Sequence, residues 1–211
     1  MFSEEIINNY ITHGNEEINL EYKNSMNWTN RNCKFEIIRV ILAMSNNSDG
    51  GVIVLGVEDK TFKPVGMNEG DYNSFKHDLV ADKLKNYCDP VVEFDLLSDT
   101  AIIEGEEKKF VVIQVKENIE LTICIKSEKN NPSIDMLPAN IALRENAVYI
   151  RSKTPIGSRE PKDSTEWRKL IEKTVEKNKN ELLKRLPCAD FVGFEKESES
   201  DKHNKDLPNY L

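Results

Sequence analysis

The stretch from Ile38 to Asp59, IRVILAMSNNSDGGVIVLGVED, constrains the fold more than any other part of the sequence. It starts as an apolar helical run, passes through a polar turn that closes on Gly50-Gly51, and continues as VIVLGV. A continuous run of valine and isoleucine that is too short for a core helix is typical of a buried strand. We therefore expect a helix over Lys34–Met44, followed by a central strand over Val52–Val57.

A second segment upstream, Leu20–Lys23, alternates between apolar and charged residues. In a strand, Glu21 and Lys23 would leave the same face, opposite to the apolar residues. A carboxylate there can bind a divalent cation, and a lysine beside it can steady a phosphate. Because one carboxylate is too little for Mg²⁺ or Mn²⁺, further acids are needed.

Two acids are candidate partners for Glu21 in such a cation site. Glu16 lies five positions before it, and Asp59 closes the predicted central strand. The alternative is that these residues are a surface ion pair and solvated acids, which in a chain with 31% charged residues is common. Spacing alone does not decide between the two interpretations.

The remaining elements predict an α+β, or mixed α/β, single domain over residues 1–186. Helical periodicity or alternation indicates helices over Ser3–Thr12, Asp71–Tyr87 and Ser164–Leu186, and strands over Val92–Leu96, Phe110–Lys116, Leu121–Lys126 and Val148–Arg151. The apolar residues of the last helix share one face. Residues 187–211 carry six acids and three lysines and are predicted to be a mobile tail.

The net charge of −8 argues against a protein coated in positive charge for nucleic acid, so a nucleic-acid surface must be local. The best candidate is the basic turn after the last strand, with Arg151, Lys153, Arg159 and Lys162. Its glycine and serines can add backbone contacts to phosphates. The competing interpretation is a solvated loop.

Several classes of protein are disfavoured. No apolar run is long enough for a membrane span, and the N-terminus lacks a signal-peptide pattern. The four cysteines are scattered, which suits reduced thiols, so we expect a cytoplasmic protein. No Walker-type glycine loop is present, and the polar turn follows a helix rather than a strand, so we expect no ATP site.

Taken together, these motifs resemble the Schlafen-type AlbA-like domain. The matching pieces are Leu20-Glu21-Tyr22-Lys23, the helix end Ala43-Met44-Ser45-Asn46, the run Gly50 to Asp59, Val65-Gly66, and Val148-Tyr149-Ile150-Arg151. They occur in the family's order over about residues 16–162. Tyr22 replaces the family's phenylalanine, and the turn before the glycines looks longer than usual.

The resemblance implies a mixed α/β nucleic-acid-binding fold, and some members of the family are metal-dependent endoribonucleases that cut structured RNA such as tRNA. Their site of two glutamates and an aspartate falls on Glu16, Glu21 and Asp59, with Glu58 as the nearby alternative and Lys23 as the adjacent lysine. Catalytic Schlafens pair two such domains around the RNA, so a chain with one would need to form a homodimer.

Three functions are compatible with these residues and with the resemblance. The first is a Mg²⁺- or Mn²⁺-dependent endoribonuclease that prefers RNA to DNA. The second is a non-catalytic DNA- or RNA-binding module of a regulatory or defence system. The third is an interaction protein whose acidic tail binds a partner.

Overall fold

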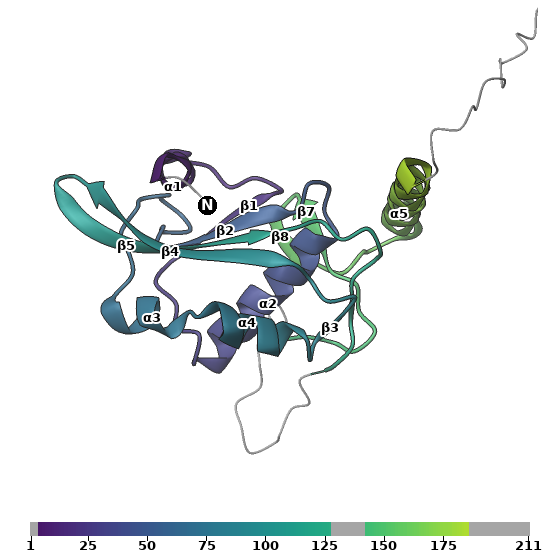
Figure 1. The fold of residues 1–211 in the computed structure, drawn as a ribbon, viewed down its shortest axis with the longest axis horizontal. Helices are drawn as coiled ribbons and strands as arrows, with labels where there is room; N and C mark the ends of the chain where they lie inside the picture. Colours follow the sequence, from purple (N-terminus) through teal and green to yellow (C-terminus); the bar gives the residue numbers. More distant parts are fainter. Residues whose placement is uncertain (1–3, 128–141, 186–211) are drawn as a thin grey trace, which may run out of the picture.

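A mixed four-stranded sheet forms the centre of the computed structural model, which describes residues 4–127 and 142–185. The sheet order is β1-β2-β5-β4, with β1 Leu20–Lys23, β2 Gly51–Leu55, β5 Glu106–Val115 and β4 Phe94–Ile103. Strand β1 runs parallel to β2, and the other neighbouring pairs are antiparallel (Figure 1). The predicted α+β class is therefore confirmed, and the valine-rich strand β2 lies inside the sheet.

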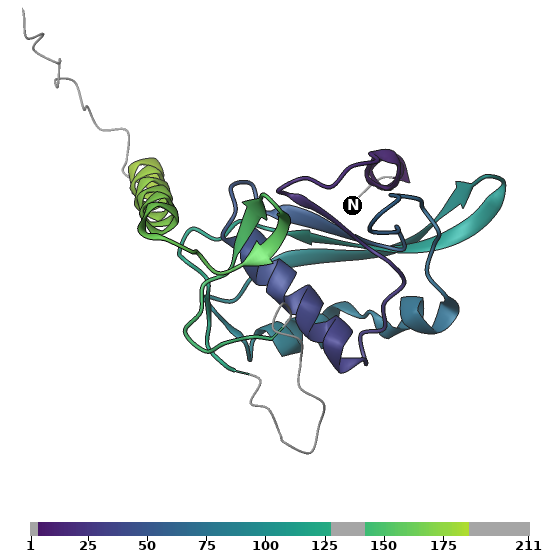
Figure 2. The ribbon, with the colours of Figure 1, turned by 180° about the vertical axis from the view of Figure 1, so that it is seen from behind.

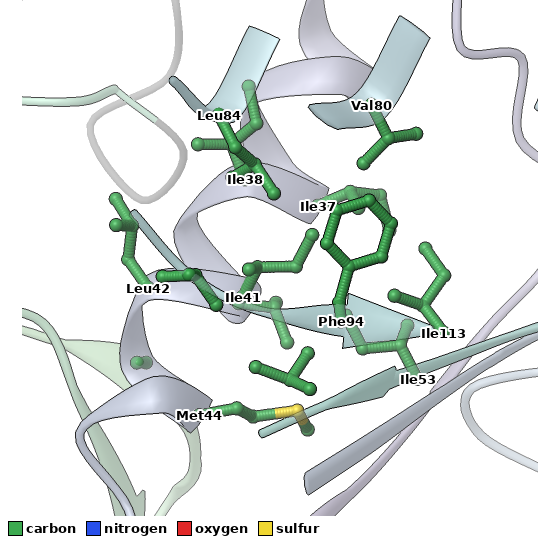
Figure 3. Close-up of a cluster of buried hydrophobic side chains, with 14 of the residues drawn as sticks. Ile37, Ile38, Ile41, Leu42, Met44, Ile53, Val80, Leu84, Phe94 and Ile113 are labelled. Carbon is green, nitrogen blue, oxygen red and sulfur yellow. The ribbon is translucent and has the colours of Figure 1, made fainter. Parts of the chain in front are cut away.

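Helix α2 (Arg31–Ser45) covers one face of this sheet (Figure 2). It begins three residues before the predicted start, because the Asn30 side chain accepts hydrogen bonds from the amides of Asn32 and Cys33. Its apolar stripe packs on the inward side chains of β2 and β5, as Figure 3 shows for Ile41, Ile53 and Ile113. This cluster is the main hydrophobic core.

A smaller apolar cluster lies on the opposite face, under helix α1 (Glu4–Thr12). Leu20 and Tyr22 belong to it, together with Val54 of β2. The predicted alternation of β1 is thus confirmed, since its two apolar residues face α1 and leave Glu21 and Lys23 on the side of α2.

The helix predicted over Asp71–Tyr87 is wrong as a single element. The chain forms α3 (Glu69–Ser74) and α4 (His77–Leu84), because Phe75 and Lys76 adopt extended backbone angles. Tertiary contacts account for the early stop. Asp71 is held by side chains of the loop before α2, and Phe75 turns inward to pack on Trp28.

The middle strands also differ from the prediction. Strands β4 and β5 are ten residues each and form a long hairpin that projects from the sheet (Figure 1). Its turn uses Glu104 and Gly105, both at positive φ. The predicted strand Leu121–Lys126 shrinks to β6 (Ile123–Cys124), which pairs with β3 (Cys88–Asp89) rather than with β5.

The predicted basic turn after residue 151 is largely a second hairpin, β7 (Ile150–Lys153) with β8 (Ile156–Arg159). Helix α5 (Ser164–Arg185) follows, and the Asp163 side chain caps its start by accepting hydrogen bonds from the amides of Thr165 and Glu166. The proposed tail, residues 187–211, lies outside the described residues. Among the described helices, none is long and apolar enough to cross a membrane.

Candidate active site and nucleic-acid interface

The ammonium group of Lys23 joins three carboxylates that come from different parts of the chain. Its Nζ lies 2.8 Å from Glu21 Oε1, 3.2 Å from Glu36 Oε1 and 3.8 Å from Asp59 Oδ2. Burial acts to lower the pKa of Lys23, but the carboxylates outweigh it, and the pKa is raised above its ordinary value. Lys23 is therefore a permanently charged centre that holds these acids together.

The buried carboxylate of Glu21 is shared between two cations. Its second oxygen, Oε2, lies 2.6 Å from the guanidinium of Arg151, whose side chain is 0% exposed. Arg151 also donates to the carbonyl oxygens of Glu17 and Ile18 and to the hydroxyl of Ser158. Arg151 thus fixes Glu21 and ties the loop before β1 to the β7–β8 hairpin.

The two remaining predicted acids are oriented by backbone amides. Asp59 Oδ1 accepts from the amide of Asn24 at 3.1 Å, and Glu16 Oε1 accepts from the amide of Tyr22 at 3.1 Å. Burial raises the pKa of Glu16, and the negative charge of Glu21 raises it further, so these two carboxylates act on each other. We call Glu21, Lys23, Glu36, Asp59 and Arg151 the ion-pair cluster, with Glu16 beside it.

The donors present suit Mg²⁺ or Mn²⁺, which prefer carboxylate oxygens. However, within residues 4–127 and 142–185 no three His, Cys, Asp or Glu side chains are grouped as they would be around a bound metal. The ammonium of Lys23 lies between Glu21 and Asp59 instead, and Glu21 already has a cation on each oxygen. The acids fit a divalent ion in chemistry, while Lys23 and Arg151 already offset part of their negative charge.

A basic cleft of about 500 Å³ adjoins this cluster, between the β7–β8 hairpin, the turn after α2 and helix α5. Its charged lining residues are five basic and one acidic, namely Arg151, Lys153, Arg159, Lys169, Lys173 and Glu166. Arg151 is the residue that the two regions share, and its buried side chain lies between the cleft and Glu21. A cleft with this balance of charge suits a phosphate backbone.

The four basic residues predicted to bind nucleic acid differ in how they are placed. Lys153 is exposed in the cleft, and Arg159 lines it while forming a two-pronged pair with Glu166 at 2.6 and 2.7 Å. Lys162 is exposed but does not line the cleft. Arg151 is buried in its pair with Glu21, so its guanidinium is not presented on the surface.

Sequence reasoning missed two residues of this region. Glu36 binds Lys23 from α2, and the sequence shows it only as an acid near the start of the predicted helix. Lys173 lines the cleft and donates to the carbonyl oxygen of Asn46 at 2.8 Å. Burial, with the nearby charge of Lys177, lowers the pKa of Lys173 to about 8.

The fold and site define a mixed α/β domain with acids gathered on Lys23 and a basic cleft that shares Arg151 with them. The chain belongs to the Schlafen, AlbA_2 family, because that family's sequence profile matches residues 16–155. The family suggests a nucleic-acid-binding domain. The resemblance drawn from the motifs is therefore confirmed.

Two further comparisons add little to this assignment. No curated protein matches the chain. Among solved structures, the DIP2311 protein from Corynebacterium diphtheriae is similar, with a TM-score of 0.46 and 11% sequence identity. The match covers 79% of this chain and 32% of that one, so the chain spans about a third of that protein's length.

Proposed function

We propose that the protein binds structured RNA such as tRNA along the basic cleft and cleaves it as a Mg²⁺- or Mn²⁺-dependent endoribonuclease. The observation that carries this proposal is the meeting of Glu21 and Asp59 on one lysine, beside a cleft lined by basic side chains. Glu21 lies within β1 and Asp59 follows β2, and both belong to the motifs that resemble the family.

Each residue has a role in this proposal. Glu16, Glu21 and Asp59 would hold the cation, which when bound would activate the attacking nucleophile and neutralise charge on the phosphate. Arg151 is a positioning residue, since it fixes Glu21 from within the fold. Lys153 and Lys169 are exposed on the cleft and would contact the RNA backbone. Preference for RNA over DNA and pairing of two chains belong to the same proposal.

Asp59 is the best position for the decisive substitution, because its side chain is 45% exposed whereas that of Glu21 is 7% exposed. We expect the wild-type protein to cut tRNA, but not single-stranded DNA, only when Mg²⁺ or Mn²⁺ is added. Asp59→Asn should lower the rate by roughly 100-fold or more, as loss of a group that stabilises the transition state does. Asp78→Asn is the matched control, since that side chain is 99% exposed on α4.

The rates of tRNA cutting by wild type, Asp59→Asn and Asp78→Asn decide whether the protein is an endoribonuclease. Equal cutting by wild type and Asp59→Asn, or no cutting of tRNA with either metal, would reject the endoribonuclease. A control variant that loses activity as strongly as Asp59→Asn would point to a contaminating nuclease or a misfolded preparation instead.

The second candidate is a non-catalytic binding module of a regulatory or defence system. It is favoured by the full pairing of Glu21 with Lys23 and Arg151, which leaves this acid neutralised without a metal. This candidate predicts salt-dependent RNA or DNA binding that Asp59→Asn does not weaken, and no turnover under any metal condition.

A further inference from the structure

Helix α5 exposes an apolar stripe that contacts little of the domain. Trp167, Ile171, Val175 and Leu182 are 38%, 54%, 63% and 63% exposed. Leu170 is buried against the domain. Lys173 and Lys177 hold the helix in place by donating hydrogen bonds to the carbonyl oxygens of Asn46 and Asn118. The helix stands at the edge of the molecule (Figure 1).

The stripe and the basic cleft occupy different faces of α5. At about 100° per residue, the four stripe residues fall within a sector of roughly 80°. Lys169 and Lys173, which line the cleft, point away from that sector. A partner on the stripe would therefore leave the cleft open to nucleic acid.

We propose that the α5 helix of a second copy covers this stripe in an antiparallel pair. We place a two-fold axis between Thr174 and Val175. Trp167 of each chain then faces Leu182 of the other, so the two ends of the stripe cover each other. A symmetric pair uses the same patch on both chains, as closed dimers do. The 22 residues of α5 give a helix of about 33 Å, which is long enough for this overlap.

The charges along the stripe favour the antiparallel direction. Glu172 and Lys179 are both exposed and flank the same edge of the stripe. In an antiparallel pair that edge meets itself, so Glu172 of each chain lies about 3 Å along the helix axis from the level of Lys179 of the other, within reach of its long side chain. In a parallel pair the two different edges meet and these ion pairs do not form.

The surface beside Leu182 also fits the proposed pair. A cleft of about 570 Å³ lies there, lined by Leu182, Ile119 and Pro90 among other residues. Ile119 is itself 40% exposed. The antiparallel register brings Trp167 of the second copy to this cleft, where an aromatic ring has apolar surface to bury.

This interface deepens the pairing of two chains that the proposed function includes, but it is tested without RNA. A monomer would therefore reject the interface without rejecting cleavage, and loss of cleavage in Asp59→Asn would not depend on the dimer. If the protein both dimerises and binds RNA, the dimer carries two basic clefts. The dimer gives each RNA two sites of contact, which raises its apparent affinity without a new contact in either cleft.

The first test is the mass of the full chain in solution, by light scattering and sedimentation at micromolar concentration. We expect a dimer whose dissociation constant rises at least about tenfold in Val175→Asp. Leu79→Asp, which alters an apolar side chain 52% exposed on α4, should leave the dimer intact. A wild-type monomer, or a dimer equally sensitive or insensitive to both variants, overturns the proposal.

Two further variants test the direction of the pair. Glu172→Lys and Lys179→Glu should each weaken the dimer, and the double variant should restore it, because the two charges exchange places. Val175→Cys, near the axis, should cross-link to its own copy with a short bismaleimide after Cys33 and Cys188 are changed to serine. Trp167→Cys in the same background should not. A double variant weaker than either single one, or the opposite cross-linking pattern, rejects the antiparallel pair.

Discussion

Two arginine–glutamate pairs in this protein have the same closest distance and very different surroundings. Arg151 with Glu21, and Arg159 with Glu166, each have a nitrogen–oxygen distance of 2.6 Å. The side chains of the first pair are 0% and 7% exposed, and those of the second are 23% and 29% exposed. The first lies inside the ion-pair cluster, and the second lines the basic cleft.

The contrast shows that contact distance alone does not measure what an ion pair contributes. Water and salt screen the cleft pair, so removing one partner leaves the other solvated. Around Arg151 and Glu21 little water can replace a lost partner, so the remaining charge is buried without compensation. The Arg151–Glu21 pair is therefore required for the fold, whereas the Arg159–Glu166 pair can be removed at a smaller cost in stability.

The largest expected effect follows from removing each arginine in turn. Arg151→Ala should lower the free energy of unfolding by about 3–5 kcal/mol, the cost of leaving a buried charge unpaired. Arg159→Ala should have a much smaller effect, because Glu166 can turn to water. Urea unfolding followed by the fluorescence of Trp28, which is 4% exposed, measures both. Similar losses in the two variants would contradict the comparison.

The next effect concerns the lysine at the centre of the cluster. Lys23→Met should lower the free energy of unfolding by about 1–3 kcal/mol, because three carboxylates lose their shared donor. Lys153→Met, an exposed lysine of the cleft, should change it little.

The pH dependence of this difference has a definite sign. The pKa of Lys23 is raised in the fold, since its carboxylate partners outweigh the opposing effect of burial. Its stabilisation is then complete below the unfolded value of 10.5 and is lost only above it. The gap between wild type and Lys23→Met should stay constant between about pH 6 and pH 9. A gap that closes in that range would show that Lys23 titrates lower than the fold implies.

Elements were predicted correctly where the pattern of apolar and polar residues matches which side chains are buried in the fold. The alternation of Leu20–Lys23 and the apolar run of β2 fixed which face Glu21 and Lys23 occupy, and the strand end brought Asp59 to them. The helix over Asp71–Tyr87 failed, because its break depends on Asp71 binding a distant loop and on Phe75 turning into the core. Those contacts have no periodic signal.

In the candidate site too, the residues with a local sequence pattern were predicted and those placed by tertiary packing were not. The family motifs indicated Glu16, Glu21 and Asp59, but nothing local marked Arg151 as buried, so the sequence grouped it with the exposed Lys153. Burial of an arginine depends on which segments pack around it, here the loop before β1 and the β7–β8 hairpin. Glu36 was missed for the same reason.

A smaller effect is expected in nucleic-acid binding by the cleft. Lys153→Ala and Lys169→Ala should each weaken tRNA binding and reduce the slope of log affinity against log salt by about 1, as loss of one phosphate contact does. Fluorescence anisotropy across a potassium chloride series measures this. Lys85→Ala, whose side chain is 62% exposed beside α4, is the control. Unchanged slopes in both cleft variants would place the nucleic acid elsewhere.

The smallest effect is expected on acidification, at the part-buried pair of Arg159 and Glu166. Hydrogen bonds from Arg159 and from the amide of Lys162 lower the pKa of Glu166 to about 2 from 4.5. A lowered carboxyl pKa stabilises the fold above 4.5, and this contribution is lost as the pH falls toward 2. The melting temperature of wild type should therefore drop slightly more over that range than that of Glu166→Gln, with Glu176→Gln following wild type. Parallel curves for wild type and Glu166→Gln would mean that water already screens the pair fully. The ion pair of Arg159 would then add no stability, and Arg159 would only shape the cleft. The difference in stabilisation between this pair and the Arg151–Glu21 pair would be large although their contact distances are equal.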